Sequence, residues 1–502
     1  SLLRNWHNLR GRHLKAAILR HLGRKDEALA LIEDSLRIDR FNFGCGFEKY
    51  LITGVEADLK ELLALMRPEA HSYEELALDY ASAGCWEEAL MAAETAIGQN
   101  VSGQTMLHYY KSWFLIQLDR KEEALAAIRE AEQQLPDCCF PNVLEAILAL
   151  QSVIGFATET PKALYYLGNL WYDKRQYPEA ITCWETSMQQ DDAFPTVLRN
   201  LSLAYFNKLN RQEEAVTLLE KAFALDMTDA RILMELDQLY KRLNCSHEDR
   251  LAFLKKHKDI AFQRDDLYLE FVTLLNQLGQ YEEAIRMIDA RKFHPWEGGE
   301  GKVPAQYQLA RVELVKQLLA EKKYEEALAL IEECFIYPHN LGEGKLYGAQ
   351  ENDFNYYKAC ALSGLGRKEE AMELFLAASI GNSQPAAAMY YNDQKPDKIF
   401  YQGLALRKLE REEEARGRFN NLISYGEKHL YDVFKMDYFA VSLPDLQIWE
   451  DDMNKKNRIH CNYLMALGHL GLGNNEKAMK YFNIAAEMDN NHQGVQIHQK
   501  MI

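Results

Sequence analysis

Two loop segments hold the residues of this 502-residue chain that are best suited to chemistry. One covers residues 293–302, the other covers residues 337–345, and both end in the sequence Gly-Glu-Gly-Lys. A glycine-rich loop followed by lysine can hold a phosphate group, so nucleotide binding is the first chemistry to consider. The phosphate-loop pattern G-x-x-x-x-G-K-S/T is absent, because Trp296 and His339 replace its first glycine and neither lysine precedes Ser or Thr. Nucleotide binding is therefore not predicted.

The same two loops offer donor atoms for a metal ion. Zinc ligands must lie about 2 Å from the ion, whereas packed helices lie about 8–10 Å apart, so the loops would have to fold towards each other. The sequence has no local ligand pair such as H-E-x-x-H, and we predict neither a metal nor a cofactor. The same residues also have a purely structural interpretation, in which the glycines allow tight turns and the Glu and Lys side chains form ion pairs. The loop candidates for a binding role are His294, Trp296, Glu297, Glu300, Lys302, His339, Glu343 and Lys345.

No pairing of a nucleophile with a base stands out in the sequence. The chain contains no G-x-S-x-G and no C-x-x-C motif, and its Asp-Asp pairs occur where turns and helix caps are expected. The cysteines number nine and lie mostly in apolar helical patterns, which is typical of reduced thiols. We therefore predict a protein that is not an enzyme and that resides in the cytoplasm.

Charge and hydropathy exclude two classes of partner. The 58 Lys and Arg residues against 75 Asp and Glu residues give a net charge of −17, whereas nucleic acids and anionic membranes bind basic surfaces. No apolar run approaches the ~20 residues of a membrane span, and the start of the chain lacks the layout of a signal peptide. A start without methionine indicates a processed chain or a piece of a longer protein, in which a targeting signal would lie upstream.

The elements that must position the loops come from an internal repeat. A helix start with acidic residues followed by alanine recurs along the chain, as in Tyr281-Glu282-Glu283-Ala284. Acidic residues complement the positive end of a helix, and the small alanine lets the preceding helix approach closely. Apolar residues at helical spacing precede each start, so each repeat is a helix hairpin that must stack on its neighbours. The alanines are Ala28, Ala89, Ala124, Ala180, Ala215, Ala284, Ala327, Ala371, Ala415 and Ala478, and Arg250 takes this position in a degenerate repeat.

The repeat resembles the tetratricopeptide repeat family, whose unit is about 34 residues long. This resemblance implies an all-α fold, an α-solenoid of stacked hairpins, made irregular here by long loops between repeats. The two loops follow equivalent helices, because Lys302 and Lys345 are 43 residues apart, as are Ala284 and Ala327. We therefore expect the loops to lie side by side on one edge of the solenoid. The resemblance is carried best by Leu164, Leu167, Gly168, Trp171, Ala180, Trp184 and Ser187.

The resemblance also implies a concave groove that is lined by the first helix of each hairpin. Aromatic, amide and basic side chains at the groove positions would suit an extended peptide or an acidic tail. An alternative stays open, in which the aromatic rings fill the packing between repeats and the polar side chains face solvent. The groove candidates are Tyr165, Asn169, Tyr172, Arg199, Phe206, Asn207, Gln238 and Lys241.

A segment with three prolines, residues 136–161, interrupts the array and predicts a boundary near residue 157. The predicted domains are residues 1–157, with repeats of the N-terminal part, and residues 158–502, with the main array and its two loop insertions.

A narrower resemblance concerns the two loops together with residues 437–445 and 458–461. They resemble the C-terminal repeat region of large bacterial proteins in which an uncharacterised β-rich domain precedes the array.

Two functions are predicted. The first is a scaffold that binds a protein segment in its groove or docks a neighbouring domain, such as an upstream domain of the same chain. The second is an accessory domain whose loops contribute to a small-molecule or glycan site that the upstream domain completes.

Overall fold

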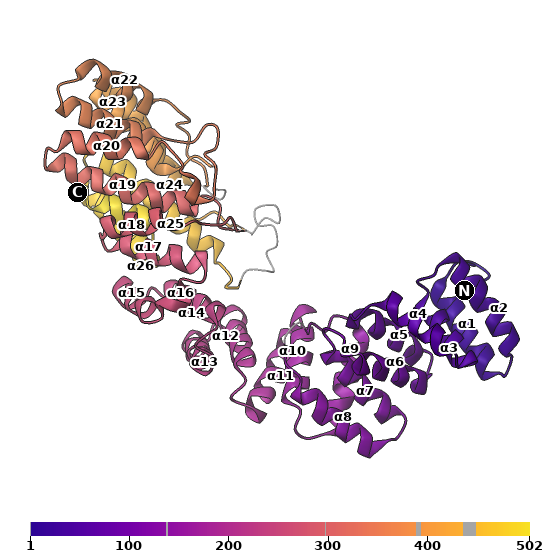
Figure 1. Ribbon diagram of the computed structural model, residues 1–502. Helices are drawn as coiled ribbons and strands as arrows, with labels where there is room; N and C mark the ends of the chain where they lie inside the picture. Colours follow the sequence, from indigo (N-terminus) through magenta and orange to yellow (C-terminus); the bar gives the residue numbers. More distant parts are fainter. Residues whose placement is uncertain (1, 137–138, 297, 388–392, 435–447) are drawn as a thin grey trace. The chain divides into compact units, whose positions relative to one another are not determined.

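The chain folds into helices joined by short turns and a few longer loops (Figure 1). The computed structural model describes residues 2–136, 139–296, 298–387, 393–434 and 448–502. Within these ranges no strand forms, and an isolated β-bridge joins Glu69 and Ser102. The predicted all-α fold is confirmed, and consecutive helices pack as hairpins that stack on their neighbours, as in an α-solenoid.

The chain divides into two compact units, Ser1–Leu225 and Asp226–Ile502. The predicted boundary near residue 157 lies inside the first unit, at a point where one helix, Leu144–Phe156, packs against helices on both sides of it along the chain. The predicted division into residues 1–157 and 158–502 differs from the division into compact units and stays a prediction.

Among its described residues, the first unit contains six helix hairpins and one helix, α9, that stands between the fourth and fifth hairpins. The hairpins pair consecutive helices, so the chain runs up one helix and down the next. The helices are α1 (Leu9–His21), α2 (Lys25–Ile38), α3 (Phe43–Thr53), α4 (Glu56–Met66), α5 (Ala70–Ser82), α6 (Trp86–Gly98), α7 (Thr105–Gln117), α8 (Lys121–Gln133), α9 (Leu144–Phe156), α10 (Pro161–Asp173), α11 (Tyr177–Gln190), α12 (Pro195–Leu209) and α13 (Gln212–Leu225).

The described part of the second unit also contains six hairpins, and it ends in one further short helix, α27. Two of its first helices, α19 and α25, are 19 residues long. The helices are α14 (Ala230–Arg242), α15 (His247–Lys256), α16 (Lys258–Ala261), α17 (Asp265–Gln277), α18 (Tyr281–Ala290), α19 (Lys302–Ala320), α20 (Tyr324–Glu333), η1 (His339–Leu341), α21 (Asn352–Gly364), α22 (Lys368–Ser379), α23 (Pro396–Lys408), α24 (Glu412–His429), α25 (Met453–Gly471), α26 (Asn475–Met488) and α27 (Gln493–Gln499).

The ten repeated alanines lie where the two helices of their hairpins meet. All ten of these alanines are at most 2% exposed, and acidic residues precede each of them in the first turn of its helix. The predicted role of the signature is confirmed: the alanine lets the helices approach, and the carboxylates complement the helix start. Arg250 occupies the same buried position in α15 and is only 1% exposed.

The close approach within a hairpin leads to a prediction about Gly168 in α10. A Cβ atom at Gly168 would lie 2.4 Å from Nε1 of Trp184, which is buried on the facing helix. We expect Gly168→Ala to lower the free energy of unfolding by about 1–3 kcal/mol, because the indole has no room to move away. Gly155→Ala in α9 is the matched control, since its Cβ would meet nothing within 4 Å. Urea unfolding followed by circular dichroism measures both, and equal midpoints would contradict the prediction.

Candidate functional site

The two Gly-Glu-Gly-Lys loops lie side by side in the second unit, as predicted. The backbone N–H of Gly301 donates a hydrogen bond of 2.7 Å to Oε2 of Glu343. The backbone N–H of Phe293 donates to the carbonyl of Asn340 at 2.8 Å, and the Asn340 amide donates back to the carbonyl of Arg291 at 3.1 Å. These bonds join the two loops along their length, so Glu343 holds the first loop in place.

The glycines of the first loop shape it around Trp296. A Cβ atom at Gly299 would lie 2.3 Å from the indole ring of Trp296, so only glycine lets the ring lie flat against the backbone. Gly301, with φ 72°, adopts the left-handed conformation and forms the N-cap of α19. Both positions therefore require glycine.

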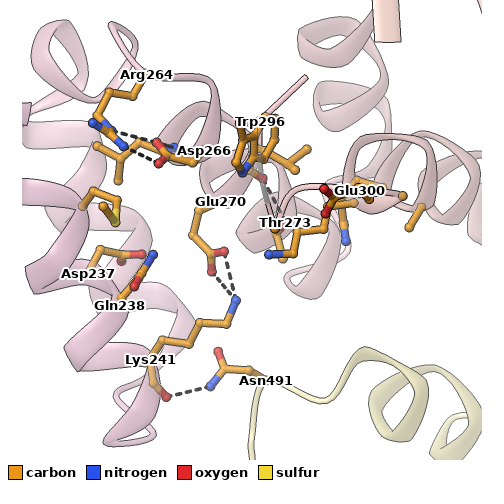
Figure 2. Close-up of a pocket in the computed structure, with 18 of the residues that line it drawn as sticks. Asp237, Gln238, Lys241, Arg264, Asp266, Glu270, Thr273, Trp296, Glu300 and Asn491 are labelled. Atoms are coloured by element: carbon orange, nitrogen blue, oxygen red, sulfur yellow. Dashed lines mark hydrogen bonds and ion pairs between the residues drawn. The ribbon is translucent and has the colours of Figure 1, made fainter. Parts of the chain in front are cut away.

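A cleft of about 640 Å³ opens beside this loop (Figure 2). Its walls come from α14, α17, the first loop with the start of α19, and the residues after α26. Two groove candidates, Gln238 and Lys241, and three loop candidates, Trp296, Glu300 and Lys302, line this one cleft. The other lining residues are Met234, Asp237, Arg264, Asp266, Leu267, Leu269, Glu270, Thr273, Gly298, Gly301, Ala305, Gln306, Lys395, Ile448, Asn491 and Gln493.

The floor of the cleft is a network of paired charges. Lys241 Nζ lies 2.9 Å from both carboxylate oxygens of Glu270 (Figure 2). Arg250, behind Glu270, donates to Asp237 Oδ1 and Oδ2 at 3.1 and 2.7 Å and to Glu270 Oε1 at 2.7 Å. Burial raises the pKa of Asp237. Burial alone would also raise the pKa of Glu270, but Lys241 and Arg250 outweigh it and lower that pKa, so Glu270 stays ionised.

Five charged side chains that line the cleft lie outside this network, and two of them, Arg264 and Asp266, pair with each other. Within the described residues, Lys302, Lys395 and Glu300 have no hydrogen bond or ion pair to their charged groups, whereas Arg264 is paired with Asp266 at 3.0 and 2.6 Å. Both lysines are exposed to solvent through the open cleft. The surrounding walls still remove part of their hydration, which lowers the pKa of Lys302 and of Lys395. Neighbouring cations act in the same direction, whereas nearby carboxylates, Glu270 and Glu300 at Lys302 and Asp397 and Asp353 at Lys395, oppose the shift.

Residues 489–499, here called the C-terminal strap, form one wall of the cleft and join the last hairpin of the unit to the first. Asn491 accepts a hydrogen bond from Arg250 at 2.9 Å and donates one to the carbonyl of Lys241 at 3.0 Å. Asn490 donates to the carbonyl of Asn244, a residue 246 positions earlier, at 2.9 Å. Gln493 and Gln306 exchange side-chain hydrogen bonds of 2.8 and 3.0 Å. The strap thus closes the array of the second unit.

Two smaller cavities adjoin the cleft. One, of about 270 Å³, lies on the other side of the first loop and shares Trp296 and Glu300 with the cleft; His294 and Glu343 also line it. The other, of about 150 Å³, shares Ala305 and Lys395 and continues along α19 towards α23. The cleft therefore extends beyond a single small pocket.

Two of the remaining loop candidates, His339 and Lys345, do not line the cleft. His339 is exposed in the short helix η1. Lys345 donates to the carbonyl of Phe335 at 3.0 Å and pairs with Glu351, so it serves the second loop itself. Glu297 lies outside the described residues. In the part of the chain that the structure describes, the donors of the two loops do not converge on a common point, and His21, Cys85 and Glu88 of the first unit form the group with ligand spacing. Glu88 of that group is already bound by Arg20 at 2.6 Å.

The other six groove candidates lie in the first unit, on α10 and α12. Tyr165 is 7% exposed and packs edge-on against Phe194, and Tyr172 packs against Trp184. Asn169 Oδ1 accepts a hydrogen bond from Trp184 Nε1 at 3.1 Å. These contacts agree with the alternative in which the aromatic rings pack between helices. Arg199, Phe206 and Asn207 lie on α12, where Arg199 donates to Asn200 at 3.1 Å.

Sequence patterns missed several residues of the cleft. Lys395 precedes α23 in a loop without a motif, and Asn491 and Gln493 follow the last recognisable repeat. One signal was available: Arg250 at a position that is otherwise alanine requires buried carboxylates nearby, which are Asp237 and Glu270.

One stretch of the chain matches a known family. Residues 74–137 match the family described as tetratricopeptide repeat. A tetratricopeptide repeat protein from Parabacteroides merdae is 15% identical, covers 60% of this chain and 98% of its own, and has a TM-score of 0.26. MamA from Desulfovibrio magneticus is 18% identical over 40% of this chain and 99% of its own, with a TM-score of 0.24. YrrB, described as having an unusual peptide-binding site, is 16% identical over 46% of this chain and 93% of its own, with a TM-score of 0.18.

None of the helices in the described part of the chain is long and apolar enough to cross a membrane.

Proposed function

From the premise that this chain is a tetratricopeptide repeat protein, we propose that it is a non-enzymatic interaction module whose second unit binds a segment of a partner protein in the cleft beside Trp296. Proteins of this family generally act as interaction scaffolds. The observation that carries the proposal is that Gln238 and Lys241 of the groove set and Trp296 and Lys302 of the loop set meet in one 640 Å³ cleft.

The dimensions of the cleft suit a chain segment better than an isolated side chain. The cleft continues past Ala305 and Lys395 into the 150 Å³ cavity along α19. An extended peptide places alternate side chains on opposite sides, so it can fill one cavity while its next residues reach the other. Trp296 on a glycine-shaped loop is the type of aromatic anchor that dominates binding at interfaces.

Peptide selection tests the proposal without knowledge of the natural partner. The whole chain is presented to a random 12-residue display library, and selected peptides are measured by isothermal titration calorimetry. We expect Trp296→Ala to weaken the selected peptides by about 30-fold, which is typical of a buried aromatic anchor. Arg199→Glu, in the first unit, should leave their affinity unchanged. Peptides that lose affinity with Arg199→Glu and keep it with Trp296→Ala would place the site in the first unit and refute the proposal.

A second function is supported by the 270 Å³ cavity behind Trp296, which His294, Glu300 and Glu343 also line. An aromatic ring with nearby carboxylates and a histidine suits a small polar molecule such as a sugar. This function predicts that an oligosaccharide panel contains members that raise the melting temperature of the chain. The stabilisation should disappear in Trp296→Ala and His294→Ala, and display selection should yield no peptide that competes with the sugar.

A further inference from the structure

The third hairpin departs from a pairing that recurs elsewhere in the described part of the chain. In five hairpins the arginine just before the second helix pairs with the glutamate that precedes the repeated alanine, and the side chain of that glutamate is at least 50% exposed. These pairs are Arg24–Glu27, Arg120–Glu123, Arg211–Glu214, Arg367–Glu370 and Arg411–Glu414. In the third hairpin Cys85 takes the place of the arginine, and Glu88 is only 6% exposed. Glu88 Oε1 instead lies 2.8 Å from Nε2 of His21, the last residue of α1.

These three side chains have the donor types and the spacing of a metal site. A ring nitrogen of His21, the Sγ of Cys85 and a carboxylate oxygen of Glu88 all lie within 4.8 Å of one another. In a tetrahedral zinc site with bonds of about 2.0–2.3 Å, neighbouring ligand atoms are about 3.3–3.8 Å apart, so small side-chain rotations bring these donors to one ion. A thiolate and an imidazole favour zinc over magnesium and calcium, which prefer oxygen ligands.

The three donors come from two helix ends. Cys85 is the N-cap of α6 and Glu88 lies in the first turn of that helix, three residues further on, so both lie on the same face. His21 ends α1, in the first hairpin. The His21 side chain is 50% exposed, so an ion can reach the three donors from solvent. An ion bound here would connect the first hairpin to the third.

Arg20 lies beside the three donors and is compatible with a cation there. It donates to Glu88 Oε1 at 2.6 Å, and to Oε2 and Oε1 of Glu48 at 2.7 and 3.2 Å. A carboxylate has two oxygens and about four acceptor positions, so Glu88 can keep Arg20 and bind an ion as well. Hydrogen bonds of this kind orient the carboxylate ligands of metal sites. Because Glu48 balances the charge of Arg20, Glu88 and a thiolate at Cys85 can balance the two charges of a zinc ion.

We propose that His21, Cys85 and Glu88 bind one zinc ion that joins α1 to α6. Three protein ligands leave the fourth tetrahedral position to water. Binding releases the thiol proton of Cys85 to solvent, and the bound ion stabilises the folded state. This site belongs to the first unit, so it is independent of the peptide cleft of the second unit.

Cobalt(II) is the first probe, because a cobalt–thiolate bond adds a charge-transfer band in the near ultraviolet. The whole chain, without an affinity tag, is reduced, stripped of metal with EDTA, and titrated with Co²⁺ and then with Zn²⁺. We expect one ion per chain, a thiolate band with cobalt, and loss of that band when zinc displaces the cobalt. Isothermal titration calorimetry should give a Kd for zinc of about 1 µM or lower.

Substitutions of single donors test the assignment. Cys85→Ser should abolish the thiolate band, and His21→Gln and Glu88→Gln should each weaken zinc binding by at least about tenfold. Cys183→Ser and His71→Gln are the matched controls and should bind zinc like the original chain. Cys183 is likewise a partly exposed cysteine of the first unit, and His71 is an exposed histidine whose ring nitrogen lies 3.4 Å from a glutamate oxygen.

Thermal unfolding provides a second readout. Zinc should raise the melting temperature of the original chain by several degrees and leave that of Cys85→Ser unchanged. Absence of a thiolate band in the original chain, or a band that persists in Cys85→Ser, would overturn the zinc assignment; so would equal zinc affinities in the original chain and in His21→Gln. Circular dichroism of the metal-free variants shows that the fold is retained, and a donor variant that fails to fold leaves the other two as the test.

Discussion

Replacing Arg250 by alanine is expected to destabilise the second unit by about 3–5 kcal/mol. Arg250 and Asp237 are both 1% exposed, and their guanidinium and carboxylate are joined by two hydrogen bonds. Without the arginine, Asp237 would remain as a buried carboxylate with no cation in contact, and Asn491 of the strap would lose the donor to its Oδ1. Urea unfolding followed by circular dichroism and tryptophan fluorescence gives the change in the free energy of unfolding.

Two further variants test whether the loss of stability comes from the buried Arg250–Asp237 pair or would follow the removal of any arginine. Arg286→Ala removes an exposed arginine, 74% accessible, from its pair with Glu283, and should change stability by less than about 0.5 kcal/mol. In the double variant Arg250→Met, Asp237→Leu no charge is left unpaired at this position, so most of the loss should be recovered. If Arg250→Ala unfolds no more easily than Arg286→Ala, the buried network does not hold the first hairpin to the strap.

Acid is expected to weaken the second unit through His498 of the strap. His498 is 4% exposed, and burial, with Lys316 acting in the same direction, lowers its pKa to about 4, although Asp397 and the carbonyl of Gly494 oppose this. The unfolded chain has a histidine pKa of about 6.5, so it binds more protons than the folded chain between these values. The stabilisation from neutral His498 is therefore complete above about pH 6.5 and falls by up to about 3 kcal/mol as the pH drops towards 4.

Thermal unfolding between pH 7.5 and 4.5 measures this effect. The melting temperature of the original chain should fall more steeply with acid than that of His498→Gln, whose amide can still donate to the carbonyl of Gly494. His294→Gln, which changes an exposed histidine, should follow the original chain. Parallel curves for all three proteins would show that His498 does not control the acid response. The histidine resonances in an NMR titration would give the pKa of His498 directly.

The helical repeats could be predicted from the sequence because each rests on local physics. The acidic first turn and the buried alanine recur in ten of the twelve hairpins that the structure describes, and the break at Pro68 matches a helix that ends at Met66. The side-by-side placement of the two loops followed from equal spacing, since stacked repeats repeat their loops at the same edge. Both results depend on contacts between neighbouring repeats.

The cleft could not be predicted, because it forms from contacts between segments far apart in the sequence, and residue spacing does not reveal such contacts. Gln238 and Trp296 were assigned to two separate sites, and the structure places them in one, because the loop lies over the first helices of the same unit. The position of Asn491 opposite Arg250 follows from the summed rotation of six hairpins, to which each repeat adds a small angle. Tyr165 could not be assigned from the sequence, because an aromatic residue at this repeat position suits both a peptide-binding groove and the packing between helices. In the structure it packs against Phe194.

The strap also restricts how the second unit can evolve. In an open solenoid each repeat contacts only its neighbours, so whole repeats can be gained or lost while the rest of the array stays intact. Here the bonds of Asn490 to Asn244 and of Asn491 to Arg250 need the last hairpin to return to the first. Inserting or deleting one hairpin would move the two ends out of register and break these bonds. The number of repeats in this unit is thus set by closure, as the number of blades is set in a propeller.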